Sequence, residues 1–221
     1  MAAGIEWQVA AGFGGAHATS LRHTENAWTP LRVTLQNRGE SQSGRIVVPV
    51  SRDSYSDPIL YAVPVDLPRG ARKSYQLLVP RVEHRMKVRL VTGAGTQTRE
   101  LQGMNAVAAG DVLMVVLSTQ DGILGFLNGT PAPAAVSTSN EPGMEPGMSP
   151  GGVASAGEFA ISQSGWGALP ESWLGWDGVD VVVAVDSELG DAEQRELEAL
   201  RLWVRLGGTV IVTGGARSPA L

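Results

Sequence analysis

The sequence contains no cysteine, and this absence excludes several kinds of chemistry. A disulfide framework, a thiolate zinc site, an iron–sulfur cluster and a cysteine nucleophile all require cysteine side chains. Aromatic residues make up only 5% of the chain, and no run of Lys and Arg interleaved with aromatics is present. Nucleic-acid-binding surfaces usually have such runs, so we expect no nucleic-acid partner.

Long apolar runs are also missing. The longest uncharged stretch, residues 122–140, contains two prolines and several polar side chains, so it does not have the character of a membrane span. The first seven residues have neither the basic region nor the apolar stretch of a secretory signal. We expect a soluble chain whose contact with a membrane depends on segments outside this sequence.

What the sequence does have is enough apolar residues for a core and an uneven charge distribution. Hydrophobic residues make up 43% of 221 positions, which suits one large or two small domains. Residues 1–104 carry 13 Lys and Arg against 8 Asp and Glu, whereas residues 105–221 carry 4 against 14. This asymmetry predicts two domains, divided near residue 104.

The first half has the pattern of an antiparallel β-sandwich of the immunoglobulin-like kind. Short strands are predicted around residues 5–10, 31–35, 46–50, 59–65, 75–79 and 86–90. Turn residues separate them, for example at 37–39 and 68–70, at a spacing typical of sandwiches. Pro49, Pro64 and Pro80 fall in or next to apolar runs, which predicts edge strands or strand ends at these positions.

The second half predicts parallel strands and a helix. Continuous apolar runs at 112–117, 179–185 and 209–212 are typical of strands that are buried on both faces. Between the last two, Leu197, Leu200 and Val204 recur at helical spacing, which indicates an amphipathic helix over 191–206. Asp191 and Gln194 have capping-box spacing, and Gly207 provides the stop. A strand, a helix and a strand joined by short loops predict a right-handed unit with two parallel strands.

Residues 128–157 differ from both halves because they are rich in Gly and Pro and contain a repeated Glu-Pro-Gly-Met tetrapeptide. Such a composition is typical of a flexible insertion. Met144 and Met148 within it have thioether side chains, which suit cuprous copper. Two methionines in a flexible linker are weak evidence, so we expect a plain linker and no metal site here.

Two motifs in the second half resemble a known group of proteins. The sequence LPESWLGWDGVD runs from Leu169 to Asp180, and WVRLGGTVIVTGG runs from Trp203 to Gly215. With residues 181–185 and the predicted helix, they resemble the class I glutamine amidotransferase-like superfamily, specifically its non-catalytic, uncharacterised bacterial cell-envelope branch with a β-sandwich ahead. The segments 12–15 and 28–37 are similar to the sandwich of those envelope proteins.

The resemblance implies a partial, flavodoxin-like parallel α/β domain at 105–221. It also implies an extracytoplasmic position, anchored to the membrane within a longer parent protein. Active members of the superfamily use a cysteine nucleophile, which this chain does not have. The chain ends where that fold would continue, so we expect a fragment of a longer protein.

Other catalytic patterns are not met. His17, His23 and His84 do not have zinc-site spacing, and Val153 stands where a serine-hydrolase elbow needs glycine. Neither a dinucleotide nor a phosphate loop is found, so we expect no cofactor, no metal and no enzymatic activity.

Two groups of residues are candidates for binding a ligand or partner. Asp186, Thr213 and Gly214 follow predicted parallel strands, whose carboxyl ends share one edge where ligands bind in open α/β sheets. They could equally be ordinary turn residues. Trp166, Trp173 and Trp176 lie on a glycine-rich stretch and could stack on sugars. Alternatively, they pack together with Trp203 in the seam, that is, the interface between the two domains. We favour this alternative because two small domains need a shared apolar contact.

The sequence as a whole predicts a non-catalytic structural or protein-interaction module of a bacterial cell-envelope protein. Its partner would be another protein or envelope component. The first alternative is a carbohydrate-binding module that uses Trp166, Trp173 and Trp176. The second alternative is a hydrolase whose active residues lie beyond Leu221.

Overall fold

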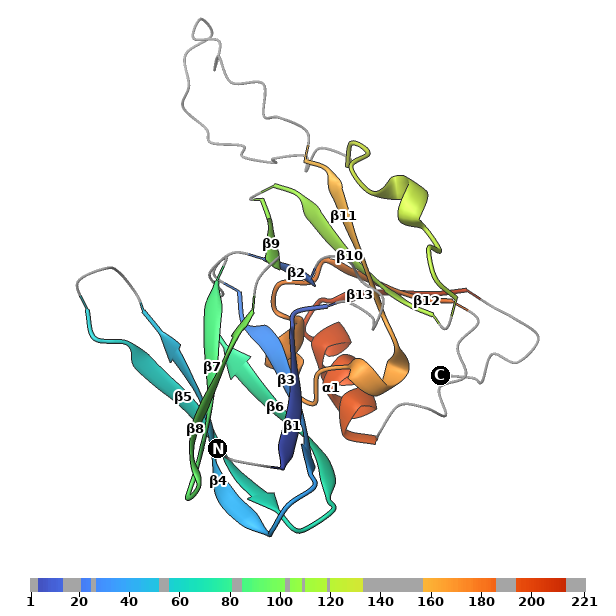
Figure 1. Ribbon diagram of the computed structural model, residues 1–221. Helices are drawn as coiled ribbons and strands as arrows, with labels where there is room; N and C mark the ends of the chain where they lie inside the picture. The colour runs from blue at the N-terminus through green and yellow to red at the C-terminus, as the bar shows by residue number, and fades with distance from the viewer. Residues whose placement is uncertain are drawn as a thin grey trace, which may run out of the picture.

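The computed structural model describes residues 4–13, 21–24, 27–51, 56–80, 85–101, 104–108, 110–118, 120–132, 157–185 and 194–213. These residues form mostly β-strands, with one α-helix and three short 3-10 helices. The strands make two antiparallel sheets, one four-stranded parallel sheet and one isolated parallel pair (Figure 1). The expected combination of antiparallel β-structure with a parallel α/β part is therefore confirmed at this level.

The two antiparallel sheets share one core. The first contains β1 (Ile5–Ala11), β3 (Thr29–Asn37) and β6 (Arg72–Val79) in the order β1-β3-β6. The second contains β4 (Gln42–Val50), β5 (Ile59–Leu67), β7 (Met86–Thr92) and β8 (Gly95–Leu101) in the order β5-β4-β7-β8. Alternate residues of β3 point inward, and the core joins Leu31, Val33 and Leu35 to Ile46, Val48 and Leu90 of the second sheet.

The predicted turn at 37–39 is built around one buried side chain. The Asn37 amide nitrogen donates to the carbonyl oxygens of Glu40 at 2.8 Å and of Leu67 at 3.0 Å. Its side-chain oxygen accepts from the Gly39 backbone N–H at 2.9 Å. Asn37 thereby ties the end of β3 to the end of β5 and satisfies backbone groups that the turn leaves unpaired.

The parallel sheet contains β10 (Val112–Leu117), β11 (Phe159–Ser164), β12 (Val181–Val185) and β13 (Thr209–Thr213). Its order is β11-β10-β12-β13, so β10, which comes first along the chain among these four strands, lies in the interior of the sheet. The three apolar runs are thus parallel strands, as predicted. The expected burial on both faces is wrong for β13, which lies at the end of this order and has Ile211 and Val212 48% and 42% exposed. β11 was not predicted from the sequence, because only its first three residues are apolar and it lies directly after the Gly/Pro-rich insertion.

The helix α1 (Gln194–Arg205) follows β12 and covers one face of the parallel sheet, beside the 3-10 helix η3 (Trp173–Trp176). Leu200 is buried against that face and Leu197 is partly buried, as the predicted period requires. The prediction for Val204 is wrong: it is 41% exposed, and its neighbour Trp203 is buried in its place. The helix ends at Arg205, and Gly207 in the turn after it has a φ of +110°, a conformation that side chains disfavour. The predicted cap at Asp191 lies outside the described residues.

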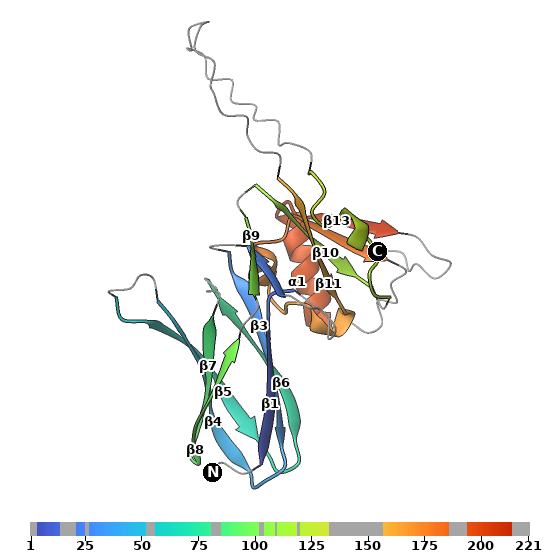
Figure 2. The same cartoon turned by 45° about the horizontal axis from the view of Figure 1, so that its top comes forward.

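The remaining elements join the two parts. A short parallel pair, β2 (Leu21–Thr24) with β9 (Met104–Val107), lies next to β10 and β11. Phe13 and Val107 belong to the core under α1, together with Trp166 of η2 (Trp166–Ala168). The other face of the parallel sheet is covered by residues next to η1 (Gly125–Leu127). In both ribbon views the sandwich meets the α/β part on the side of α1 (Figure 2).

The described residues contain no helix that is both long and apolar enough to cross a membrane.

Candidate functional site

The carboxyl edge of the parallel sheet is the first candidate site. The connection that follows β10 leads to β11 on one side, whereas the connection that follows β12 leads to β13 on the other side, so the strand order reverses between β10 and β12. Such a switch in strand order is where open α/β sheets bind ligands. Ser118, which follows β10, and Thr213, which ends β13, both lie at this edge.

Most polar groups at this edge hold the loop after β10. The Ser118 hydroxyl accepts from the Gln120 N–H at 3.0 Å. The Gln163 side chain donates to the Gln120 carbonyl oxygen, and its own oxygen accepts from the Gly122 N–H at 2.9 Å. Gln163 therefore holds the loop against β11. The polar side chains of Ser118 and Gln163 thus bind the backbone of this loop.

The residues that the sequence singled out at this edge are only partly described. The Thr213 hydroxyl is at the exposed end of β13 and donates a long hydrogen bond, 3.4 Å, to the carbonyl oxygen of Ala184. Asp186 and Gly214 lie outside the described residues. A ligand site made by these three residues therefore stays a prediction.

The three tryptophans do not form one exposed surface. Trp166 and Trp176 are 4% and 0% exposed, and only Trp173, at 38%, presents much of its side chain to solvent. The ring of Trp176 lies 5.2 Å from that of Phe13 and 5.8 Å from that of Trp203. All three side chains cannot stack on a sugar together in this arrangement, because two of them are buried in the core.

The buried tryptophans lie where the two parts of the chain meet. Phe13 follows β1 of the sandwich, whereas Trp176 and Trp203 belong to the α/β part. The indole N–H of Trp176 is buried without a hydrogen-bond partner among the described residues. These side chains provide apolar contact between the sandwich and the α/β part. Apolar contact is not directional, so hydrogen bonds and ion pairs are needed to fix the relative position of the two parts.

Arg32 supplies the main polar connection between the parts. It projects from β3, and its guanidinium donates to the carbonyl oxygens of Gly167 and, at 3.2 Å, of Leu169. The same group forms an ion pair with Glu196 of α1 at 3.3 Å. Glu196 is 3% exposed, so its carboxylate depends on this cation for compensation.

Two further bonds extend this connection, which we call the Arg32 clamp. The Gln76 amide of β6 donates to the Leu169 carbonyl oxygen at 2.7 Å, and its oxygen accepts from the Glu171 N–H at 2.9 Å. At the other end of η3, the Trp28 N–H donates to an Asp177 carboxylate oxygen at 3.3 Å. The conformation of the segment from Gly167 to Asp177 is thus fixed by side chains and backbone of the sandwich.

Asp180 has a shifted acidity. Burial raises the pKa of its carboxyl group above the usual range, and a hydrogen bond from the Leu113 N–H, at 2.7 Å, acts in the opposite direction. The Asp180 N–H also donates to the Leu113 carbonyl oxygen at 3.0 Å. Asp180 therefore anchors the start of β10 beside β12, which is a structural position at the amino edge of the sheet, away from the switch in strand order.

No cluster of three or more His, Asp or Glu side chains with metal-site geometry occurs in the described ranges. His17, His84, Met144 and Met148 lie outside them.

Sequence reasoning missed Arg32, Gln76 and Glu196. Arg32 and Gln76 occupy outward positions of strands, where polar residues are expected, and nothing in their order along the chain shows that residues of the α/β part lie against them. Glu196 gave a weak signal, because it lies one helical turn before Leu200 and so falls on the predicted apolar face.

Comparison with known proteins adds little about function. No curated protein matches the chain. Among solved structures, a β-glucosidase from Listeria innocua is 15% identical with a TM-score of 0.29, over 47% of this chain and 17% of that enzyme. A carbohydrate acetylesterase from Xanthomonas citri is 13% identical with a TM-score of 0.27, over 90% of this chain and 57% of the esterase. Residues 4–104, which contain the sandwich strands, match a family described as a domain of unknown function, DUF8726.

Proposed function

We propose that this chain is a non-catalytic protein-interaction module of a bacterial cell-envelope protein. In this proposal an immunoglobulin-like sandwich and a flavodoxin-like α/β domain of the glutamine amidotransferase-like superfamily act as one unit. The sheet order β11-β10-β12-β13 supports the second assignment, because flavodoxin-like sheets have their first strand between the second and third. The superfamily's cysteine nucleophile is missing from the sequence.

The observation that carries the proposal is the Arg32 clamp. Interfaces between domains of one chain are usually polar enough to permit movement. Here a cation of the sandwich is bound to two carbonyl oxygens and to a buried carboxylate of the other part. A fixed arrangement of two domains is what a scaffold or docking module requires, since it presents surfaces at a constant distance.

Cell fractionation tests the location that this function requires. An antibody raised against the chain should detect its native protein in the envelope fraction of source cells, at a mass above 23.2 kDa. Detection in the cytosol alone would overturn the envelope assignment. Turnover of ester, glycoside or amide substrates by the purified chain would overturn its non-catalytic character.

The carbohydrate-binding alternative depends on Trp173, the exposed member of the three tryptophans. Titration with cell-wall oligosaccharides should leave the tryptophan fluorescence unchanged if the module binds protein. Quenching that disappears in a Trp173→Ala variant would favour the alternative, and Trp28 provides a matched control because it also lies near η3. Quenching lost equally in Trp28→Ala would point to a general change of the seam.

A further inference from the structure

The second sheet of the sandwich divides between β4 and β7. These strands are paired with each other only up to Val47 and Arg89. Beyond that point β4 remains paired with β5 through Val50, and β7 remains paired with β8 back to Met86. Pro49 lies two residues beyond the last of these pairs, and it has no N–H to donate to a neighbouring strand. The backbone edges of the two ribbons thus face each other without pairing.

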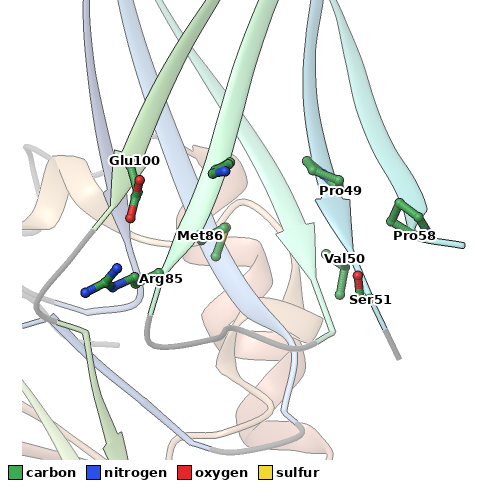
Figure 3. A pocket seen from close by; sticks show the side chains of 8 residues that line it. Pro49, Val50, Ser51, Pro58, Arg85, Met86 and Glu100 are labelled. Carbon is green, nitrogen blue, oxygen red and sulfur yellow. The ribbon is translucent and has the colours of Figure 1, made fainter. Parts of the chain in front are cut away.

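A cavity of about 370 Å³ lies between the two diverging strand ends, residues 48–51 at the end of β4 and 85–88 at the start of β7, which we call the fork. Figure 3 shows Arg85, Met86 and Glu100 on one side of it and the β4 side, with Pro49 and Val50, on the other. Val50 and Met86 are buried and face the core, so they form an apolar floor. The volume is at the lower end of the range for ligand sites and suits a short segment of chain.

The rim of the fork is cationic. Arg85 and Lys87 are both exposed and lie two residues apart, so they are on the same, outward side of the strand. Glu100 lies opposite Lys87 in the β7–β8 register and offsets one of these charges. Arg85 has no ion-pair partner among the residues that the structure describes. The described residues that line the fork therefore carry two positive charges and one negative charge.

We propose that this fork binds an extended peptide in which acidic and apolar residues alternate. A strand placed between β4 and β7 can bond to both unpaired backbone edges, which is how sheets bind peptides by strand addition. Successive side chains of a strand point to opposite faces. An apolar side chain then lies over Val50 and Met86, and its acidic neighbours lie beside Arg85 and Lys87.

This inference rests on the proposed protein-interaction function and specifies the kind of peptide that one partner would present. The two can fail separately, because peptide binding at the fork is measured on the purified chain, whereas the interaction role is tested by location in the cell and by turnover.

The test uses a fluorescein-labelled pentapeptide that alternates glutamate with valine. Its fluorescence anisotropy should rise on addition of the protein and saturate. The double variant Arg85→Glu/Lys87→Glu should weaken binding by about tenfold or more, since both charges then repel the peptide. Arg72→Glu is the matched control, because Arg72 is an exposed arginine at the opposite end of the sandwich, and it should change binding by less than about twofold.

A second peptide separates strand addition from simple charge attraction. It has the same composition, with the glutamates grouped together, and should bind at least about tenfold more weakly because it cannot place acidic and apolar groups on alternate faces. Because the chain has no cysteine, a Ser51→Cys variant can carry a single environment-sensitive dye beside the fork, which should respond to the alternating peptide. Absence of binding, equal binding of both peptides, or equal weakening by Arg72→Glu would each overturn the proposal.

Discussion

Replacing Arg32 with alanine tests whether the Arg32 clamp holds the two parts of the chain together. The change removes the cation 3.3 Å from the Glu196 carboxylate and the donor to the Leu169 carbonyl oxygen. The Glu196 side chain is only 4% exposed, so water cannot take the place of the guanidinium without opening the seam. We expect a large loss in the free energy of unfolding.

The size of this loss follows from the burial of the pair. Removing one partner of a buried ion pair costs about 3–5 kcal/mol. The Arg32 side chain keeps 25% exposure, and Glu196 takes part in a further interaction, so the low end of the range applies. A loss of about 3 kcal/mol corresponds to about a 150-fold change in the folding equilibrium constant. For a chain of this length it lowers Tm by about 6–12 °C.

Urea unfolding, followed by tryptophan fluorescence, measures the effect, since Trp176 and Trp203 lie in the core beside the clamp. Arg38→Ala is the control, because Arg38 also pairs with a glutamate, Glu6 at 3.0 Å, but both side chains are more than 60% exposed. Exposed pairs contribute about 0–1 kcal/mol, so this variant should be nearly as stable as the original chain.

The double variant Arg32→Met/Glu196→Leu checks the cause. It removes the carboxylate together with its cation, so it should recover much of the stability lost in Arg32→Ala. If Arg32→Ala costs no more than Arg38→Ala, or if the double variant is less stable than Arg32→Ala, the ion pair between Arg32 and Glu196 does not hold the two parts together.

Three further predictions concern other parts of the fold. The raised pKa of Asp180 means that its protonated form favours the folded state, so this contribution is present at acid pH and is lost as pH rises through the folded-state pKa. Asp180→Asn should therefore flatten the stability profile just above pH ~4 in urea unfolding followed as a function of pH, and an unchanged profile would contradict this. Gly175→Ala places a Cβ 2.5 Å from the Pro170 side chain and should lower Tm, whereas Gly165→Ala, in the same loop with open space around it, should not; equal Tm values would refute the packing argument. Ile211→Lys on the edge strand β13, where the native side chain is 48% exposed, should reduce concentration-dependent association in light scattering, because a charge blocks edge-to-edge pairing; unchanged scattering would refute this.

Local patterns were sufficient to predict most of the elements. The alternation at Leu31, Val33 and Leu35 predicts a half-buried strand because side chains alternate across a pleated backbone. The continuous run at 112–117 predicts a strand covered on both faces, and β10 has such a position. The helical spacing of Leu197 and Leu200, with Gly207 after it, gave α1 to within a few residues. These properties depend on neighbours along the chain, so the sequence alone determines them.

The sites depended on contacts between residues far apart in the sequence. Trp166, Trp173 and Trp176 have similar surroundings along the chain, and only tertiary packing, such as that of Phe13 and Trp203 on Trp176, decides which of them remain exposed. The Arg32 clamp includes a hydrogen bond between residues 135 positions apart. The fork exists because β4 and β7 diverge beyond Val47 and Arg89; Pro49 marks this region in the sequence, but not which strand separates from β4. Local patterns specify which face of an element is apolar, whereas the partner of each polar side chain is set by the tertiary arrangement.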